Sequence, residues 1–322
     1  IETHDLTKKY ANDFVALDSL NLSIEEGEVF GYIGPNGAGK TTTIRILCGL
    51  LKPTAGQALI AGHDVRRHPR SVRKLAGYLP DSFGVYEEMR VWEYLDFFGA
   101  CFKVPKKVRR QRIDEVLDVT QSSAMRDYFV DTLSHGMRQR IGIAKTLMHD
   151  PQVLFLDEPT SGLDPRGRIE MRTMIQRLAE MGKTVLVSSH ILPELATVAD
   201  RVGIIENGQL LAHGSITEIM EQVRPNRLIQ MRFLSDADEV TQVVNDLVEQ
   251  NSIFHPELYE DVLQFEVSGD DALLASVLTY FVTSGISVAW YQEQEADLEE
   301  AFMKVTDSSV APGARRNTRA EG

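Results

Sequence analysis

A glycine-rich stretch near the start of the chain has the composition and spacing of a loop that binds phosphate groups. Residues 34–41 read GPNGAGKT and fit the pattern GxxxxGK[ST], between an apolar run and a helical pattern. Glycines let backbone N–H groups close around phosphate oxygens, and the N-terminus of the following helix adds a positive dipole. The stretch therefore predicts a loop that binds a nucleoside triphosphate.

The side chains of this loop have separate expected roles. Lys40 would neutralise the β- and γ-phosphates, the Thr41 hydroxyl would ligate Mg²⁺, and the Thr42 hydroxyl would donate to the α-phosphate. A glycine-rich turn without a ligand is the alternative, and the strand before the loop and the helix after it count against that alternative. The residues expected to contact the nucleotide here are Gly34, Pro35, Asn36, Gly37, Ala38, Gly39, Lys40, Thr41 and Thr42.

A pair of acidic residues follows an apolar run further along the chain. Residues 153–156 read VLFL and are followed directly by Asp157 and Glu158. Since ligands bind at the carboxyl ends of parallel strands, we expect both carboxylates at the sheet edge beside the phosphate-binding loop. Asp157 would belong to the Mg²⁺ shell, and Glu158 would accept a proton from an attacking water. The alternative, a surface acidic pair, is disfavoured directly after a buried strand and before Pro159.

Strands and helices alternate around these residues. Residues 1–30 have the pattern of short strands in an edge sheet, and residues 28–33 that of a strand leading into the loop. The runs 153–156 and 184–188 have the composition of buried parallel strands. Residues 88–150 have helical patterns and predict a helical insertion. The predicted class is α/β, with a parallel sheet, an antiparallel edge sheet and this insertion.

The length of 322 residues suggests about two domains. We expect a first domain over 1–220, a polar linker over 221–227, a small α+β domain over 228–306 and a disordered tail over 307–322. The second domain has the pattern of a ferredoxin-like fold. Its expected strands are 228–233, 261–267 and 286–291, and its expected helices are 236–250, 271–284 and 296–305.

Composition and charge exclude several classes of function. Hydrophobic residues make up 43% and charged residues 25%, as in globular proteins. The two cysteines, Cys48 and Cys101, are far apart in the sequence, as is usual for a protein of a reducing compartment. Neither has the pattern of a metal ligand or of a catalytic nucleophile. The net charge of −13 comes from the C-terminal part, since residues 228–306 hold 16 acidic and two basic residues. Without a basic stripe, no nucleic-acid partner is expected.

The uncharged stretch Ala272–Trp290 is close to the length of a membrane span. It holds six serine, threonine and glycine residues, and acidic residues flank it on both sides without a lysine or arginine anchor. We therefore expect a helix, a stop at Gly285 and a strand instead of a span.

Together these residues resemble the ATP-binding subunit of an ABC transporter, because further elements occur in that family's order. Tyr10 resembles the aromatic residue on which adenine stacks, and Asp81 stands where the Q-loop glutamine is expected. Residues 133–137, LSHGM, look like the signature motif, and residues 161–164, SGLD, resemble the D-loop. His190 resembles the switch histidine. The resemblance covers about residues 1–215, and LEEAF at 298–302 is similar to the extension of ABC-2 exporter ATPases.

The resemblance implies a composite site. In this family two nucleotide domains pair head to tail, so that ATP lies between one phosphate-binding loop and the partner's signature. Ser134 and Gly136 hold the family's positions for γ-phosphate contact, and Asp164 belongs to the D-loop at the nucleotide. His190 would hold the γ-phosphate and the attacking water, and together with Lys40 and Glu158 it makes up the implied catalytic set.

Two positions depart from the family's pattern. Asp81 replaces the usual glutamine, and its carboxylate can still reach Mg²⁺ or a bound water although it is shorter and charged. His135 replaces the first glycine of the signature pair, and Met137 the usual glutamine. We expect His135 to be an exposed structural imidazole.

The implied function is ATP binding and hydrolysis that powers transport, in the export direction, through a separate membrane-spanning permease. ATP and Mg²⁺ would be required, the nucleotide subunits would form a homodimer or heterodimer, and the chain would be peripheral at the cytoplasmic face of the membrane. One alternative is a soluble ABC ATPase that acts in translation or DNA repair. The sequence has a single phosphate-binding loop and no heptad run of a coiled coil, and both features count against this alternative. A regulator that hydrolyses little is another, disfavoured by the presence of Glu158 and His190.

Overall fold

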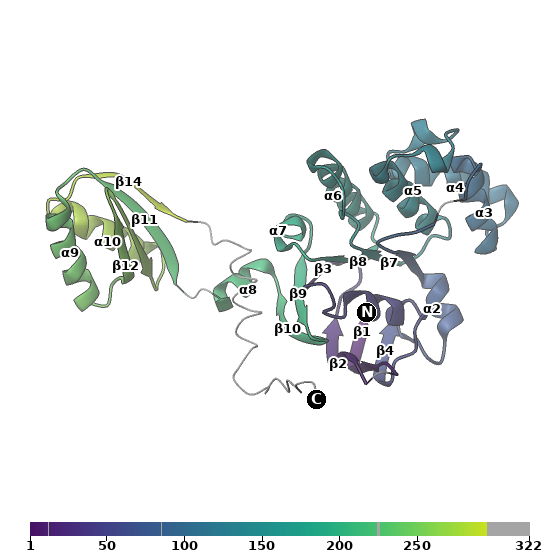
Figure 1. Ribbon diagram of the computed structural model, residues 1–322, viewed down its shortest axis with the longest axis horizontal. Coiled ribbons are helices and arrows are strands. Elements are labelled where there is room, and N and C mark those ends of the chain that lie inside the picture. The colour runs from purple at the N-terminus through teal and green to yellow at the C-terminus, as the bar shows by residue number, and fades with distance from the viewer. Residues whose placement is uncertain (12, 85, 224–225, 295–322) are drawn as a thin grey trace, which may run out of the picture. The chain divides into compact units, whose positions relative to one another are not determined.

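The structure is a computed structural model that describes residues 1–11, 13–84, 86–223 and 226–294 (Figure 1). The chain divides into two compact units, residues 1–216 and 217–322. The helix predicted at 296–305 and the tail predicted at 307–322 lie outside the described residues.

The first unit is built on a six-stranded sheet in the order β10-β9-β3-β8-β7-β6. All neighbours pair in parallel except β9 and β10, which are antiparallel, so the predicted parallel sheet is confirmed and has one reversed edge strand. Every residue of β3, β7 and β8 is buried, which explains their continuous apolar runs. The strands are β3 (Val29–Ile33), β6 (Ala76–Leu79), β7 (Val153–Asp157), β8 (Thr184–Ser189), β9 (Arg201–Glu206) and β10 (Gln209–Gly214).

The predicted antiparallel edge sheet is confirmed in the order β2-β1-β4-β5. It holds two strands that the sequence analysis did not predict, β4 and β5, because half of β4 is exposed and β5 has two residues. Apolar residues of β1 and β2 share one core with β3 and helix α1. The strands are β1 (Glu2–Lys9), β2 (Val15–Ser23), β4 (Ala55–Ile60) and β5 (His63–Asp64).

Helices connect the strands and form the predicted insertion (Figure 1). Within residues 88–150 the chain forms α3, α4 and α5, and the predicted apolar faces of α3 and α4 are buried, as Tyr94 and Val116 illustrate. The helices of this unit are α1 (Lys40–Leu47), α2 (Pro69–Leu75), α3 (Val91–Cys101), α4 (Lys106–Val119), α5 (His135–Leu147), α6 (Pro165–Glu180) and α7 (Leu192–Leu195).

The second unit has a four-stranded antiparallel sheet in the order β12-β13-β11-β14. With a helix between β11 and β12 and another between β13 and β14, this is the βαββαβ arrangement of ferredoxin-like folds. The edge strand β12 was not predicted, because its side chains are almost all exposed and show no apolar alternation. The elements are α8 (Ile216–Val223), β11 (Arg227–Phe233), α9 (Ala237–Glu249), β12 (Phe254–Tyr259), β13 (Val262–Val267), α10 (Asp271–Thr283) and β14 (Val288–Glu293).

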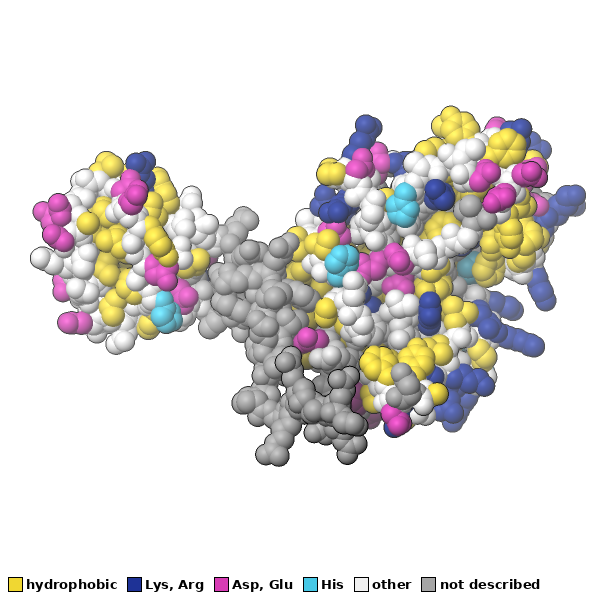
Figure 2. All heavy atoms as spheres, in the orientation of Figure 1, with side chains coloured by type: hydrophobic (Ala, Val, Ile, Leu, Met, Phe, Trp, Pro, Cys, Tyr) yellow, Lys and Arg dark blue, Asp and Glu magenta, His cyan; other side chains and the backbone are white. Residues whose placement is uncertain are grey.

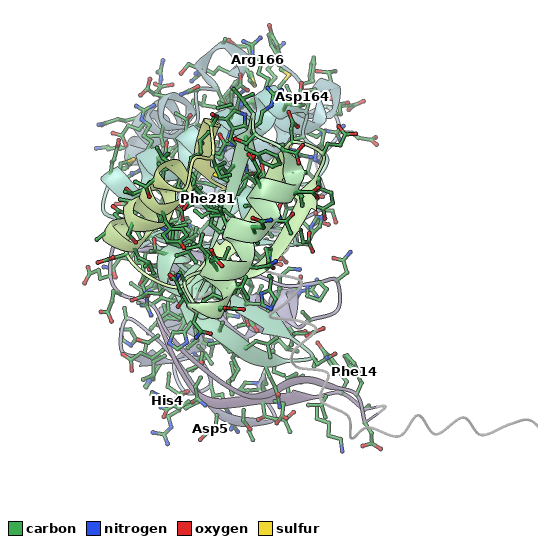
Figure 3. The ribbon with its side chains drawn as sticks, turned by 90° about the vertical axis from the view of Figure 1, so that its left-hand side faces the viewer. His4, Asp5, Phe14, Asp164, Arg166 and Phe281 are labelled. Atoms are coloured by element: carbon green, nitrogen blue, oxygen red, sulfur yellow. The ribbon has the colours of Figure 1, made fainter. Side chains whose placement is uncertain are left out.

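The core of the second unit lies between its sheet and its two long helices. Phe265 of β13 and Phe281 of α10 are both fully buried, with ring centroids 5.9 Å apart (Figure 3). The uncharged stretch forms α10, 13 residues long, followed by Gly285 at φ +92° and then β14. In the described part of the chain, no helix is both long and apolar enough to cross a membrane. Acidic side chains are scattered over the visible face of this unit in Figure 2.

Candidate active site

The phosphate-binding loop connects β3 to α1, as predicted, and two of its glycines are required by close contacts. Gly39 precedes α1 with φ +112°, and a Cβ there would lie 2.6 Å from the carbonyl oxygen of Ala16. A Cβ on Gly34 would lie 2.2 Å from the carbonyl oxygen of Ile205. Side chains at these positions would push the loop away from β2 and β9, so the glycines fix where the backbone N–H groups lie.

A pocket of about 290 Å³ lies beside this loop. It brings the loop together with the predicted Asp81 and Glu158, and it adds Phe14 and Ala16 from the edge sheet. The lining residues are Phe14, Ala16, Pro35, Asn36, Gly37, Gly39, Lys40, Thr41, Thr42, Asp81 and Glu158.

A larger cavity of about 480 Å³ opens against β4 and β5. Its lining includes none of the predicted site residues, and Asp64 there accepts hydrogen bonds from the backbone N–H groups of Arg66 and Arg67, as in a turn. The smaller pocket, which holds the predicted residues, is therefore the candidate site.

The strand order explains how separate parts of the sequence reach this pocket. β8 lies between β3 and β7, with Ile33 opposite Ser189 and Asp157 opposite Ser188. Because the three strands run in parallel, their carboxyl ends meet at one edge of the sheet. The phosphate-binding loop, the acidic pair and the segment around His190 therefore converge.

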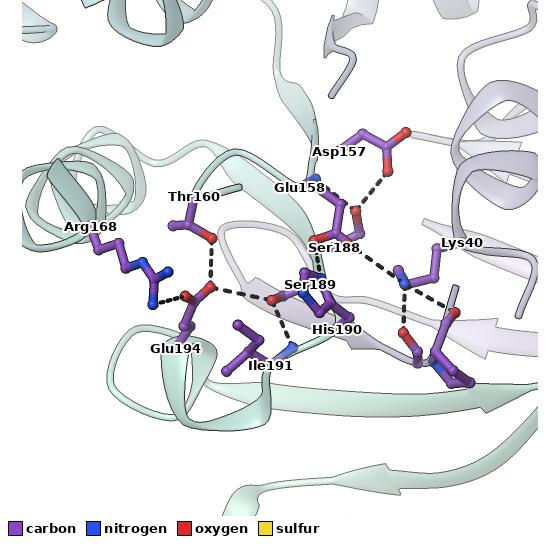
Figure 4. Close-up of polar contacts among 12 residues, drawn as sticks. Lys40, Asp157, Glu158, Thr160, Arg168, Ser188, Ser189, His190, Ile191 and Glu194 are labelled. Atoms are coloured by element: carbon purple, nitrogen blue, oxygen red, sulfur yellow. Dashed lines mark hydrogen bonds and ion pairs between the residues drawn. The ribbon is translucent and has the colours of Figure 1, made fainter. Parts of the chain in front are cut away.

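Lys40, Glu158 and His190 form one connected group (Figure 4). The ammonium of Lys40 lies 3.2 Å from Oε1 of Glu158 and donates to the carbonyl oxygens of Gly34 at 2.5 Å and Pro35 at 3.3 Å. Nδ1 of His190 lies 2.8 Å from Oε2 of Glu158. The Lys40 and Glu158 side chains are only 6% and 14% exposed, so their attraction is little screened by solvent.

Ser188 joins the Asp157 carboxylate to the backbone of Glu158 behind this group. Its fully buried hydroxyl donates to Oδ1 of Asp157 at 2.7 Å and accepts from the backbone N–H of Glu158 at 3.0 Å. Glu158 itself has φ +52°, a left-handed conformation that costs a non-glycine residue about 1–3 kcal/mol. The bond to Ser188 therefore helps to hold a strained residue in place.

Asp157 is buried at the end of β7 and has a second donor. The Tyr78 hydroxyl lies 3.5 Å from its Oδ2, and burial, with the charge of Asp157 adding to it, raises the pKa of Tyr78 to about 12. Tyr78 therefore stays protonated and able to donate. The sequence analysis missed Ser188, although a serine pair ending a buried apolar strand is a usable signal.

Two aromatic residues lie at the side of the pocket. Tyr10 is 38% exposed, and its hydroxyl lies 3.5 Å from that of Thr42. Its ring stacks on Phe14, with centroids 6.5 Å apart and planes 22° apart. Phe14, labelled in Figure 3, is 52% exposed and lines the pocket, whereas Tyr10 does not. The sequence analysis placed this position only within the edge-sheet strands expected over residues 1–30 and gave it no role at the nucleotide.

The signature and D-loop residues lie outside the pocket lining, and two of them have roles at helix ends. Ser134 precedes α5, where its hydroxyl accepts from the Met137 N–H at 3.4 Å. Asp164 precedes α6 and accepts from the Gly167 N–H at 2.8 Å (Figure 3). Capping of this kind explains the residue types through local structure alone.

The two segments are joined directly within this chain. The exposed His135 donates from Nε2 to the Ser161 carbonyl oxygen at 2.9 Å, which links the signature to the D-loop. A Cβ on Gly136 would touch Leu163 of the D-loop at 3.4 Å. The signature and the D-loop therefore form one surface.

Comparison with known proteins identifies the family. A family model described as ABC transporter matches residues 17–161. The chain is 40% identical over 233 residues to the ABC transporter ATP-binding protein all4389 of Nostoc sp., covering 68% of each chain. It is 37% identical over 309 residues to the bacitracin transport ATP-binding protein BcrA of Bacillus licheniformis, covering 95% of this chain and 96% of that one. The chain belongs to the ATP-binding proteins of ABC transporters.

Other relatives differ in length. The match to the probable multidrug ABC transporter ATP-binding protein YbhF of Escherichia coli, 39% identical over 222 residues, covers 69% of this chain but 38% of that one.

Among solved structures, the ATP-binding cassette MJ0796 in a dimeric post-hydrolysis state with ADP and Pi gives a TM-score of 0.61 at 25% identity. That match covers 67% of this chain and 98% of MJ0796. The chain is an ATP-hydrolysing ATP-binding subunit, and a role in translation or DNA repair is not favoured.

Proposed function

We propose that this chain hydrolyses ATP in the pocket beside the phosphate-binding loop and thereby drives export through a separate membrane-spanning permease. The observation that carries the proposal is the convergence of Lys40, Glu158 and His190, at 3.2 Å and 2.8 Å, next to that loop. Lys40 begins α1, whereas Glu158 and His190 directly follow β7 and β8, so residues far apart in the sequence form one connected group.

The nucleotide would lie along the pocket from the aromatic pair to the acidic residues. Adenine would stack on Tyr10, with Phe14 widening the aromatic surface. The phosphates would be held by the N–H groups of the loop and the first turn of α1, and by Thr42. The Lys40 ammonium would move from the Gly34 and Pro35 carbonyl oxygens onto the β- and γ-phosphates.

Hydrolysis needs positioning and charge stabilisation more than covalent help from the protein. Glu158 accepts the proton of the attacking water as the water oxygen bonds to the γ-phosphorus and the bond to ADP breaks. His190, bonded to the same carboxylate, orients the water and the γ-phosphate. Lys40 offsets the negative charge that spreads over the phosphate oxygens.

A Mg²⁺ ion fits the residues at this edge of the sheet. Among the described residues there is no preformed cluster of three histidine, cysteine or acidic ligands, which suits an ion bound through few side chains, waters and substrate phosphates. The Thr41 hydroxyl and the Asp157 carboxylate would hold it, with Asp81 reaching the ion or its water. Oδ1 and Oδ2 of Asp157 each accept one hydrogen bond, so each retains a lone pair for an ion. When bound, the ion neutralises phosphate charge.

Pairing of two nucleotide subunits, as homodimer or heterodimer, would complete the site. Ser134 and Gly136 would contact the γ-phosphate held by the partner, with Asp164 beside them, which agrees with their position outside this chain's own pocket. MJ0796 was solved as such a dimer with ADP and Pi. Closing of the pair around ATP would be the step that does mechanical work.

The helical insertion would transmit this motion to the permease. Figure 2 shows hydrophobic side chains gathered over it, and Tyr86, Phe97 and Phe102 are 50%, 41% and 42% exposed. Asp81 connects this region to the pocket, since its carbonyl oxygen accepts from Gln139 of α5 at 3.4 Å. BcrA is named for bacitracin transport, and DrrA3, a relative from Streptomyces coeruleorubidus, is named for daunorubicin resistance. Both names support export. A place at the cytoplasmic face of the membrane follows from this role.

The test is substitution of the proposed base. Glu158→Gln keeps the size of the side chain and a donor or acceptor for His190 but cannot take the proton, so phosphate release should fall at least 100-fold while ATP binding remains. ATP should also stabilise a dimer of the variant, measured by light scattering. Glu180→Gln, an exposed position of α6, is the matched control and should keep full activity. Phosphate release by Glu158→Gln near the normal rate would remove Glu158 from the proposed role.

A further inference from the structure

Glu194, on the short helix α7, gathers three partners that the proposed mechanism does not use (Figure 4). Oε2 accepts from the Thr160 hydroxyl at 2.6 Å and from the Ser189 hydroxyl at 3.4 Å. Oε1 pairs with Nη1 of Arg168 at 3.0 Å. The Glu194 side chain is only 12% exposed, and the two hydroxyls that donate to it belong to buried residues.

The contact with Ser189 bears on the switch histidine. Ser189 directly precedes His190 and is fully buried, and its hydroxyl also accepts from the Ile191 N–H at 3.0 Å. One side chain therefore ties together the residues on both sides of His190. The His190 side chain is 44% exposed, so its place beside Glu158 depends on this backbone more than on packing.

The other contacts of Glu194 lead to the D-loop, residues 161–164. Thr160 directly precedes this loop and is buried. Arg168, which pairs with Glu194, also donates from Nε to the carbonyl oxygen of Leu163 at 3.1 Å. The residue before the D-loop is therefore hydrogen-bonded to Glu194 directly, and Leu163 within the D-loop is linked to the same carboxylate through Arg168.

We propose that Glu194 is a positioning residue for ATP hydrolysis, which fixes residues 189–191 so that His190 stays on Glu158 and ties that segment to the D-loop. The inference rests on the proposed role of His190. Removal of the carboxylate leaves two buried hydroxyls without this acceptor, and buried polar groups rearrange to find partners. Since the Ser189 hydroxyl is attached to the residue beside His190, the rearrangement displaces the histidine.

Steady-state kinetics of the full-length chain test this inference. Glu194→Ala should lower kcat about 10- to 100-fold, the effect of a small misplacement of a catalytic group, with KM for ATP and binding of a fluorescent ATP analogue nearly unchanged. Glu194→Gln keeps an acceptor oxygen for the two hydroxyls and should restore part of the rate. Arg172→Ala is the matched control, because Arg172 lies on α6 like Arg168 but donates to the Thr197 hydroxyl, and the variant should keep full activity.

A direct measurement on the histidine separates positioning from general support of the fold. The ring nitrogen signals of His190 in ¹⁵N spectra, assigned by their loss in His190→Gln, should shift in Glu194→Ala and stay unchanged in Arg172→Ala. Unmoved His190 signals, or a normal kcat in both Glu194 variants while His190→Gln is inactive, would overturn this inference alone. Full turnover by His190→Gln would overturn the proposed role of His190 and this inference with it.

Discussion

Replacement of Ser188 by alanine should reduce both the stability and the activity of this ATPase. The change removes the hydrogen bond of 2.7 Å to the Asp157 carboxylate and leaves the partly buried N–H of Glu158 without its acceptor at 3.0 Å. A hydrogen bond to a charged group contributes about 1.5–3 kcal/mol, and an unpaired buried group costs about 1–3 kcal/mol. These ranges sum to about 2.5–6 kcal/mol, and a value near the lower end, about 3 kcal/mol, is expected because the Glu158 N–H is only partly buried.

Two assays measure the consequences. At about 2–4 °C per kcal/mol for a unit of this size, the melting temperature should fall by roughly 6–12 °C. Phosphate release should fall about tenfold or more, because Glu158 is the proposed base and its left-handed backbone loses a support. Both values are measured on the same preparation, by calorimetry and by a phosphate-release assay at saturating ATP.

A control on the same strand separates the two effects. Thr184 lies at the other end of β8, is buried, and its hydroxyl accepts from the Gly27 N–H at 2.9 Å. Thr184→Val should lower the melting temperature and leave kcat unchanged, since this end of the strand is away from the pocket. If Ser188→Ala melts and turns over like the unchanged protein, the link from the Asp157 carboxylate through Ser188 to the Glu158 backbone does not have the role that we infer.

Two further predictions concern the aromatic pair and the buried lysine. Phe14→Ala and Tyr10→Ala should each weaken ATP binding by about 1–3 kcal/mol, or roughly 5- to 150-fold, if both rings form the adenine platform. A calorimetric titration that finds unchanged affinity for either variant rejects that residue. Burial lowers the pKa of Lys145 to about 8, and its ammonium lies over the rings of Phe83 and Phe98 at 4.6 and 5.2 Å. Between pH 8 and about 10 the unfolded chain therefore binds more protons than the folded chain, so the free energy of unfolding should rise over that range. Lys145→Met should remove this rise, as measured by urea unfolding. An identical pH dependence in the variant would contradict the prediction.

Local patterns were enough to predict the parts of the site that lie within one stretch of sequence. The phosphate-binding loop needs its glycines and Lys40 at fixed spacing, and Asp157 and Glu158 directly follow a run that has to be a buried strand. The α/β fold with its insertion was predicted for the same reason, since buried strands and amphipathic helices have distinct periods.

The parts that were missed depend on neighbours far apart in the sequence. Ser188 links the Asp157 carboxylate to the Glu158 backbone only because β8 lies beside β7, and no single segment of the sequence shows the strand order. Phe14 reaches the pocket because the edge sheet packs against the phosphate-binding loop. Besides the nearby Ser189, Glu194 contacts Thr160 and Arg168, which lie far from it in the sequence. The strand β12 was missed for another reason, since an exposed edge strand has no apolar alternation to detect.

That same edge strand has a consequence for how the second unit behaves in a crowded solution. An open edge invites another chain to add a strand, which is a common route to aggregation. Here Pro256 removes one backbone donor, the pairing of β12 with β13 is irregular between Phe254 and Glu257, and the charged Glu257 is exposed. These features make the edge that β12 forms among the described residues a poor template for a strand added from another chain.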